Sequence, residues 1–303
     1  SKSTGNVISP EDILKNYGAD ILRVWVASSD YAEDLRIDTG ILKQHAESYR
    51  KIRNTFRYIL GNLKDNYEQQ EFDKLDFKKF NELEQYILHK LFIIDKSVQE
   101  NLKNYNFHKL YKELINFCTL DLSSFYFDIR KDVLYCDSLN SKKRKDCVIV
   151  LNIILESLLK WFAPILVFTT EEIFSLINKK EESIHELSFA KIPSKWENAN
   201  LYDKWTKLYK IKQEANVAIE EKRANKEIGS SLEAEIKITT DSKNFDLMEG
   251  LDLAEYFITS KAEKLKSENK SEFKIEVTKT TGTKCPRCWK ILERKCNRCE
   301  EAI

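Results

Sequence analysis

Apolar side chains recur every three or four residues along most of the first 180 positions. One such stripe runs over 49–63, a second over 83–98 and a third over 107–118. This spacing places the apolar residues on one face of a helix. The connecting segments, such as 65–76 and 137–145, are polar. The pattern therefore predicts a bundle of amphipathic helices.

The longest apolar run extends from Val148 to Phe168, and Asn152, Glu156 and Lys160 interrupt it. Charged side chains near the middle of a bilayer are costly, which disfavours a membrane span. A helix buried in the centre of the bundle explains the run better. We expect a shorter helix to begin near Thr170.

The first 38 residues combine a polar loop with a short helix. Ser9 followed by Pro10 and two acidic residues is typical of a helix start, because Ser caps the helix and Pro fits its first turn. Gly18 is expected to end this helix, and the apolar segment Ile21–Val26 follows it.

The pattern changes after residue 200. We expect a charged helix from about 201 to 226, and the alternation over Glu233–Ile238 predicts a strand. A short helix around Phe245–Tyr256 and strand-like segments at Tyr256–Ser260 and Phe273–Val277 complete a small α/β module. The expected fold class is mainly α, with a helical bundle, this module and a cysteine-rich tail.

Composition limits the partners and the compartment. Charged residues make up 33% of the chain, but the net charge is only +1. Any contact with nucleic acid must therefore come from local patches. The chain starts without an apolar leader, and its single Met is Met248. We therefore expect a cytoplasmic protein whose sequence does not begin at a natural start, and in which Cys118, Cys136 and Cys147 are ordinary reduced thiols.

Four of the seven cysteines form two CxxC pairs, Cys285 with Cys288 and Cys296 with Cys299, separated by seven residues. Each CxxC turn can present two thiolates to one metal ion, and two turns complete a tetrahedral set. We therefore expect one structural Zn²⁺ per chain, with no open position for a catalytic water. A redox pair or a disulfide framework is the less favoured alternative.

The loop Ser1-Lys2-Ser3-Thr4-Gly5-Asn6 combines a cation, hydroxyls and a glycine, which suit a polyphosphate but also a solvated loop. Followed by Val7–Pro10 and Tyr17–Arg23, it resembles the KMSKS-loop region of class I aminoacyl-tRNA synthetases. The resemblance implies that Lys2, with Ser1 and Ser3, binds ATP, used with Mg²⁺. Lys2 would stabilise the triphosphate electrostatically during amino-acid activation. The sequence then begins inside this motif.

Further segments resemble the isoleucyl branch of that family. Arg50–Tyr58 is similar to the first helix of its anticodon-binding domain, and Ser124–Asp132 and Trp161–Ile173 are similar to later parts. Ile228–Ala234 is the most diagnostic segment. Many bacterial members also have a C-terminal zinc domain with a Trp after the first CxxC pair, as Trp289 is here. The spacer between the pairs is shorter than is usual in the family, which puts the shape of that loop and its tRNA contacts in doubt.

The resemblance implies four parts. Residues 1–38 would end the catalytic domain, 39–200 form the anticodon-binding helical bundle, 201–278 form a connecting helix and the small α/β module, and 279–303 form a zinc knuckle. The whole protein would be a monomer that activates isoleucine with ATP and esterifies it to tRNA-Ile. This sequence has no HIGH motif and no editing domain, so we expect no ATP–pyrophosphate exchange from it alone.

The resemblance leaves the tRNA contacts open. Arg50, Arg53 and Arg57 share one helix face, which could bind phosphates or simply be solvated. Trp289 lies among basic residues and could stack on a base or pack beneath the cysteine turns. A valyl- or leucyl-type synthetase and a non-catalytic RNA-binding zinc protein are the alternatives. The segment 229–234 and the four cysteines argue against the first, and the motif at Ser1 argues against the second.

Overall fold

The computed structural model describes residues 8–63, 67–178, 182–269 and 272–300. The chain forms two compact units. The first comprises residues 1–126 and 146–197, and the second comprises 127–145 and 198–303. The division expected from the sequence includes residues 127–145 in the helical bundle. In the structure these residues pack in the second unit.

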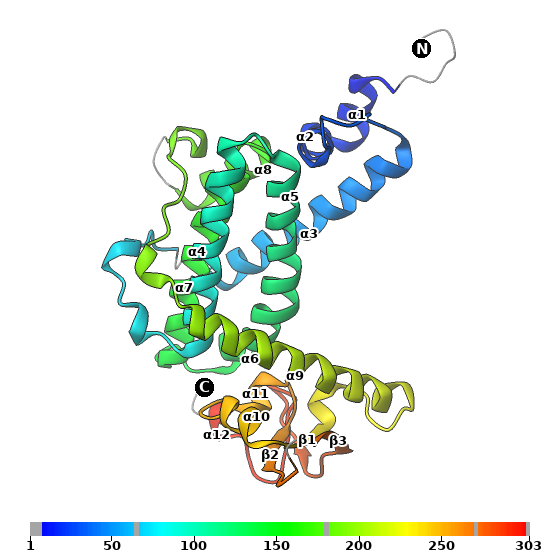
Figure 1. Ribbon diagram of the computed structural model, residues 1–303, viewed down its shortest axis with the longest axis vertical. Coiled ribbons are helices and arrows are strands. Elements are labelled where there is room, and N and C mark those ends of the chain that lie inside the picture. The colour runs from blue at the N-terminus through cyan, green and yellow to red at the C-terminus, as the bar shows by residue number, and fades with distance from the viewer. Residues whose placement is uncertain (1–7, 64–66, 179–181, 270–271, 301–303) are drawn as a thin grey trace. The chain divides into compact units, whose positions relative to one another are not determined.

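The first unit is helical, and Figure 1 shows α4 and α5 running side by side in it. Its main elements are α1 (Pro10–Tyr17), α2 (Ala19–Ser28), α3 (Thr39–Leu63), α4 (Glu82–Lys103), α5 (Phe107–Asn116), the π-helix η4 (Phe117–Tyr126), most of α7 (Lys142–Phe162) and α8 (Val167–Ile177). Short 3-10 turns occupy Phe72–Lys74, Phe77–Lys79, Ile184–Glu186 and Ser194–Trp196. The predicted helical bundle is confirmed, and Ser9 caps α1 by accepting a hydrogen bond from Glu11 N at 3.1 Å.

The helix α7 is the buried centre of this unit. Leu151, Ile154 and Leu158 have no exposed surface, and the ring of Phe162 meets Phe56 of α3 edge-on, with centroids 6.1 Å apart. The predicted buried helix is confirmed, and it ends just before Pro164, where the chain turns into α8. Among the described helices, none has the length and apolar character needed to cross a bilayer.

The π-helix is a feature that the apolar spacing does not predict. Its hydroxyl side chains bind carbonyls five residues back: Ser123 Oγ donates to Cys118 O at 2.8 Å and Ser124 Oγ to Thr119 O at 2.9 Å. These bonds follow the wider spacing of a π-helix. Its Asp121 lies 3.0 Å from Lys90 Nζ of α4. Burial raises the pKa of Asp121, and the Lys90 ammonium only partly offsets this effect.

Two charged residues of α2 bind the turn between α7 and α8. Asp20 is buried and accepts hydrogen bonds from Phe168 N at 3.3 Å, Thr169 N at 2.8 Å and Thr169 Oγ1 at 2.6 Å. Arg23 donates to the carbonyls of Ile165 at 3.1 Å and Pro164 at 2.7 Å. The carboxylate thus caps the start of α8, whose first amides have no partner within the helix, and the guanidinium takes up the carbonyls before it.

We expect Asp20→Ala to lower the free energy of unfolding of the first unit by about 1–3 kcal/mol, because buried donors lose their acceptor. Urea denaturation followed by circular dichroism measures this change. Asp34→Ala is the matched control at an exposed position, and it should change stability by less than about 0.5 kcal/mol. Equal effects of the two substitutions would contradict the capping role.

The second unit combines helices with two small sheets. Its elements are α6 (Phe127–Cys136), α9 (Ala199–Ala224), β1 (Ala234–Thr240), α10 (Ser242–Leu247), α11 (Leu253–Tyr256), β2 (Lys261–Lys266), β3 (Phe273–Lys279), β4 (Thr283–Lys284), β5 (Ile291–Leu292) and α12 (Asn297–Glu300). The larger sheet has the order β2-β1-β3, with β1 parallel to β2 and antiparallel to β3, and β4 pairs with β5. The helix α9 packs against β3 (Figure 1). The predicted small sheet region is confirmed.

The strand predicted at Tyr256–Ser260 is wrong. Tyr256 ends α11, and the following residues form a turn in which Ile258 has a φ of 59° and Thr259 N donates to Ala254 O at 2.9 Å. The segment is apolar because this turn is buried. A buried helix end and a buried strand give the same short apolar run, so periodicity does not separate them.

The next strand along the chain, β2, was not predicted because most of its residues are charged. It lies at the edge of the sheet, where Lys261 pairs with Glu235 of β1 at 2.9 Å and Glu263 pairs with Lys237 at 2.7 Å. Charged side chains are common on edge strands because they discourage pairing with another chain. The lack of apolar alternation therefore reflects the position of the strand in the sheet.

Two cations paired with the buried Glu255 hold α6 within the second unit. Glu255 of α11 is only 8% exposed, and its two carboxylate oxygens lie 2.5 Å from Arg130 Nη1 of α6 and 2.6 Å from Lys143 Nζ. Transferring charged groups out of water raises their free energy. Pairing each carboxylate oxygen with a cation offsets this penalty.

We expect Glu255→Gln to destabilise the second unit by about 3–5 kcal/mol, because the buried Arg130 guanidinium loses the charge of the carboxylate that faces it. The midpoint of thermal unfolding would show the loss. Glu263→Gln removes a carboxylate from an exposed pair and should have little effect. A Glu255→Gln protein as stable as Glu263→Gln would show that the triad does not stabilise the fold.

Candidate metal centre

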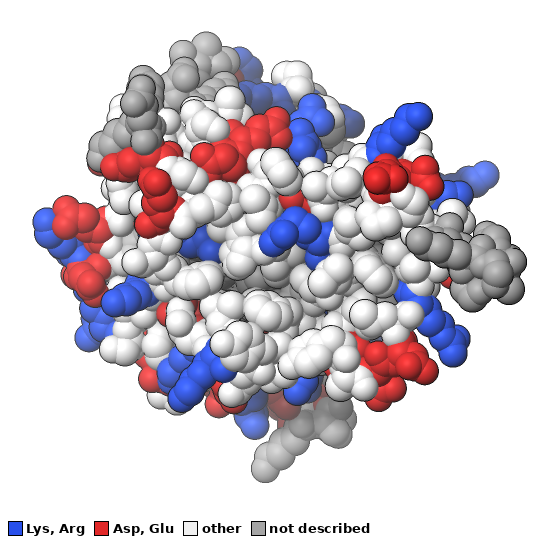
Figure 2. Space-filling view, turned by 90° about the horizontal axis from the view of Figure 1, so that it is seen from above, with Lys and Arg blue, Asp and Glu red and all other residues white. Residues whose placement is uncertain are grey.

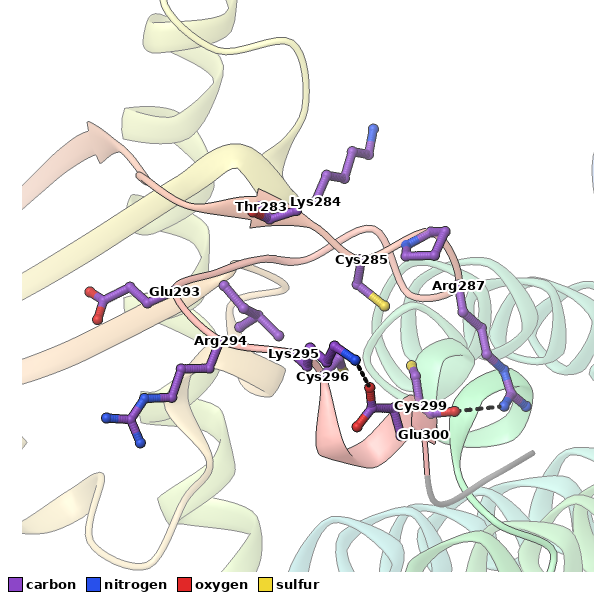
Figure 3. A pocket seen from close by; sticks show the side chains of 12 residues that line it. Thr283, Lys284, Cys285, Arg287, Glu293, Arg294, Lys295, Cys296, Cys299 and Glu300 are labelled. Atoms are coloured by element: carbon purple, nitrogen blue, oxygen red, sulfur yellow. Dashed lines mark hydrogen bonds and ion pairs between the residues drawn. The ribbon is translucent and has the colours of Figure 1, made fainter.

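Four cysteine side chains converge near the C-terminal end of the described chain. Cys285 follows β4 and Cys288 lies in the next turn, while Cys296 precedes α12 and Cys299 lies within it. Their four Sγ atoms all lie within 4.8 Å of one another, and those of Cys288 and Cys296 are 3.8 Å apart. Figure 3 shows Cys285 and Cys299 directed toward each other from the two turns.

Local hydrogen bonds shape the two turns. Cys285 N donates to Lys290 O at 2.8 Å, Trp289 N to Cys285 O at 2.9 Å and Cys299 N to Cys296 O at 3.0 Å. Gly282 precedes the β4–β5 hairpin with a φ of 132°, and a Cβ at this position would lie 2.4 Å from the carbonyl oxygen of Leu292. Only glycine avoids this clash, so the hairpin that carries the first turn requires it.

The donor set fits a zinc ion. Four sulfurs placed tetrahedrally about 2.3 Å from one zinc lie about 3.8 Å from each other. The 3.8 Å between Cys288 and Cys296 matches this geometry, and the wider pairs need only small side-chain shifts. All four cysteines are free thiols. In the described ranges, no other group of three or more His, Cys, Asp or Glu side chains converges in this way.

The four thiols differ in acidity. Burial acts to raise the pKa of Cys285, but hydrogen bonds from the backbone of Cys288 and Arg287 lower it to about 7. Burial raises the pKa of Cys288 and Cys299. Since a metal ion binds thiolates, its binding must displace the protons that these two residues hold. Metal affinity is therefore expected to fall as the pH falls.

An open cavity of about 540 Å³ adjoins the cysteines (Figure 3). Its charged lining residues are Lys284, Arg287, Glu293, Arg294, Lys295 and Glu300. Cations outnumber acids here, and Lys295 pairs with Glu300 at 3.7 Å. This end of the second unit is therefore locally basic although the chain is nearly neutral.

Trp289 lies on the surface beside this cavity. Its side chain is 60% exposed, its φ is 64°, and Lys284 Nζ lies 5.7 Å from the ring centroid. The ring is exposed and does not pack beneath the cysteine turns, and its stacking on a base stays a prediction. A base could reach the ring in this position.

The three candidate arginines lie on α3 in the first unit, and all are exposed. Arg50 forms an ion pair with Glu47, and Arg53 lies 3.6 Å from Glu172 and donates to Tyr49 Oη at 3.1 Å. Two of the three are therefore partly neutralised by neighbours. Basic and acidic side chains are also interspersed over the face that Figure 2 shows. Lys2, Ser1 and Ser3 lie outside the described residues.

Two sets of long-range contacts were not predicted from the sequence, those of Asp20 and Arg23 and those of Cys136. Asp20 and Arg23 belong to the Tyr17–Arg23 motif, but their partners lie more than 140 residues away along the chain. Cys136 packs against Cys288 and Cys299 from α6, and no spacing rule connects it to the CxxC pairs. Cys136 is buried next to these two cysteines but belongs to neither CxxC pair.

Comparison with known proteins assigns the class. Residues 84–238 match the anticodon-binding domain of tRNA ligases, and residues 1–38 match the class I tRNA synthetases (I, L, M and V). The chain therefore belongs to the family of tRNA-ligase anticodon-binding domains.

Its similar curated relatives are isoleucine–tRNA ligases. The chain is 58% identical to that of Pelagibacter ubique strain HTCC1062, with 98% of this chain and 33% of the relative covered. It is 40% identical to that of Agrobacterium fabrum strain C58, with 96% and 31% covered, and 38% identical to that of Caldanaerobacter subterraneus subsp. tengcongensis, with 97% and 33% covered. The chain thus spans about one third of these relatives. The predicted resemblance to the isoleucyl branch is confirmed.

Among solved structures, a chain from the Agrobacterium radiobacter K84 agnB2 LeuRS-tRNA-LeuAMS ternary complex is 14% identical. The match has a TM-score of 0.49 and covers 79% of this chain and 24% of that chain. Such a similarity is too low to assign a function.

Proposed function

We propose that the chain is the tRNA-binding C-terminal part of an isoleucine–tRNA ligase, an enzyme that activates isoleucine with ATP and esterifies it to tRNA-Ile. The observation that carries this proposal is 58% identity to such a ligase over 98% of the chain. In the whole enzyme Lys2, with Ser1 and Ser3, would contact ATP. The division at residues 38, 200 and 278, a monomeric state and a cytoplasmic location belong to the same proposal.

In the whole enzyme, the part formed by this chain would contribute to the reaction by holding tRNA. The exposed arginines of α3 would position the RNA through its phosphates, which carry no sequence information. Trp289 would add stacking on an unpaired base, and the neighbouring Lys284 would attract the RNA backbone. Recognition of RNA would therefore combine electrostatic attraction from basic residues of both units with stacking on Trp289.

We further propose that Cys285, Cys288, Cys296 and Cys299 hold one structural Zn²⁺. When bound, the ion would supply folding energy to the tail, because four protein ligands fill its coordination sphere. The residues around it would then keep Trp289 at the surface. The converging sulfurs and the absence of disulfides at these positions support this proposal.

We expect one zinc ion per chain, measured by elemental analysis after dialysis. Cys299→Ser should lose most of it, because a ligand is removed, whereas Cys136→Ser should retain it, because Cys136 lies outside the set of four. Wild-type affinity should be lower at pH 6 than at pH 8, since protons compete for the thiolates. Metal-free wild-type protein, or full retention by Cys299→Ser, would exclude the proposed site.

We expect the chain to bind tRNA-Ile more tightly than tRNA-Val or a tRNA-Ile with a substituted anticodon, and to keep this preference when salt is raised. Trp289→Ala should weaken binding to tRNA-Ile by about 5- to 100-fold, the range for one lost base stack. Trp289→Phe should retain most of the affinity because it keeps an aromatic face. Fluorescence anisotropy at two salt concentrations measures all of these.

Tyr31→Ala is the control, since Tyr31 is an exposed aromatic residue of the first unit. Binding that is equal for all three tRNAs and strongly weakened by salt would mean that the chain supplies only phosphate attraction. The same affinity for Trp289→Ala and Tyr31→Ala would remove the stacking role.

A further inference from the structure

The cysteine turns do not stand alone but dock on α6. Arg287, within the first CxxC pair, donates from Nη2 to Tyr135 O of α6 at 3.2 Å and from Nη1 to Cys299 O at 3.4 Å. Its own carbonyl lies 4.0 Å from Cys136 Sγ. One arginine therefore joins both cysteine turns to the C-terminal end of α6.

A second arginine makes the charged part of this contact. Arg298 lies between Cys296 and Cys299, and its guanidinium is 3.9 Å from Asp132 Oδ2 and 3.6 Å from Asp137 Oδ1. The side chains of Asp132 and Asp137 are 18% and 13% exposed, and that of Arg298 is 29% exposed. Screening by solvent is weaker for such partly buried charges than for surface pairs.

This contact is held by charge and not by hydrogen bonds. Arg298 Nη2 and Asp137 Oδ1 are both buried and lack a hydrogen-bond partner among the described residues. Four thiolates around a divalent ion carry a formal charge of about −2. Without Arg298, such a centre would face two carboxylates of the same sign at the end of α6.

We propose that Arg298 is a positioning residue that bridges the metal-loaded cysteine cluster and the acidic end of α6, so that metal binding and docking of the tail stabilise each other. This inference rests on the proposed zinc site. Since α6 lies in the same unit as the cysteine turns, metal binding would fix Trp289 relative to α6. Cys136 fills the space beneath the cluster and takes no part in coordination.

Arg298→Gln in the full chain tests this role, with Arg294→Gln as the matched control. Arg294 is exposed, lies two residues from Cys296 and lines the open side of the cavity. Arg298→Gln should lower zinc affinity about 10- to 100-fold, the usual effect of removing a group that supports the ligands of a metal. Arg294→Gln should change it less than about threefold, because Arg294 does not bridge the centre to an anion. Competition with a chromophoric chelator measures both values.

A readout at saturating zinc separates docking from metal binding. Hydrogen exchange of the backbone amides in 283–300 and 127–137 should be faster in Arg298→Gln than in wild type, even with the metal bound. The amides of α9 and of the β2-β1-β3 sheet should exchange as in wild type, which would show that the unit is folded. Wild-type zinc affinity and wild-type exchange in Arg298→Gln would overturn the proposal.

Removing the carboxylates provides a charge test. Adding Asp132→Asn and Asp137→Asn to Arg298→Gln should restore most of the lost zinc affinity, because the repulsion that Arg298 offsets is gone. A triple variant as weak as Arg298→Gln would overturn the bridging role. If wild type itself binds no zinc, the proposed zinc site fails, whereas a zinc-binding wild type with an unaffected Arg298→Gln contradicts this inference alone.

Discussion

The buried carboxylate of Glu255 is the constraint on which the second unit depends. It places Arg130 of α6 and Lys143 on its two oxygens, and it does so where water is largely excluded. Leaving a buried charge without its partner is strongly destabilising, so this triad favours the observed packing of α6 against α11. Asp132 of the same helix and Asp137, the residue after it, face Arg298. The cysteine cluster therefore packs on a helix that takes part in two sets of ionic contacts, one with Glu255 and one with Arg298.

The first unit uses charge in a different way. Asp20 and Arg23 bind backbone groups at the junction of α7 and α8, where both helices leave amides or carbonyls without partners. The Tyr17–Arg23 segment, which marks the synthetase family in the sequence, thereby has a structural role of its own. It binds α2 to the start of α8. Residues that match the class I synthetases therefore pack directly against the helical bundle.

Residues whose partners are close in sequence were predictable, and those whose partners are distant were not. The cap at Ser9, the buried α7 and the strand β1 follow from local spacing, and so does the set of four cysteines. The contact of Cys136 with Cys288, the pairing of β2 with β1 and the capping of α8 by Asp20 depend on the tertiary fold, which periodicity does not encode. The π-helix escaped prediction because its apolar residues still recur at intervals that suit an α-helix.

The second unit is assembled from two stretches of chain, 127–145 and 198–303, with part of the first unit encoded between them. During synthesis α6 therefore leaves the ribosome long before α11 and the cysteine turns that complete its surroundings. Its apolar residues Phe127, Ile129 and Val133, buried in the finished protein, are without their final cover for that interval. The unit can close only after the cysteine turns have also been synthesised, so it forms later in translation than the first unit.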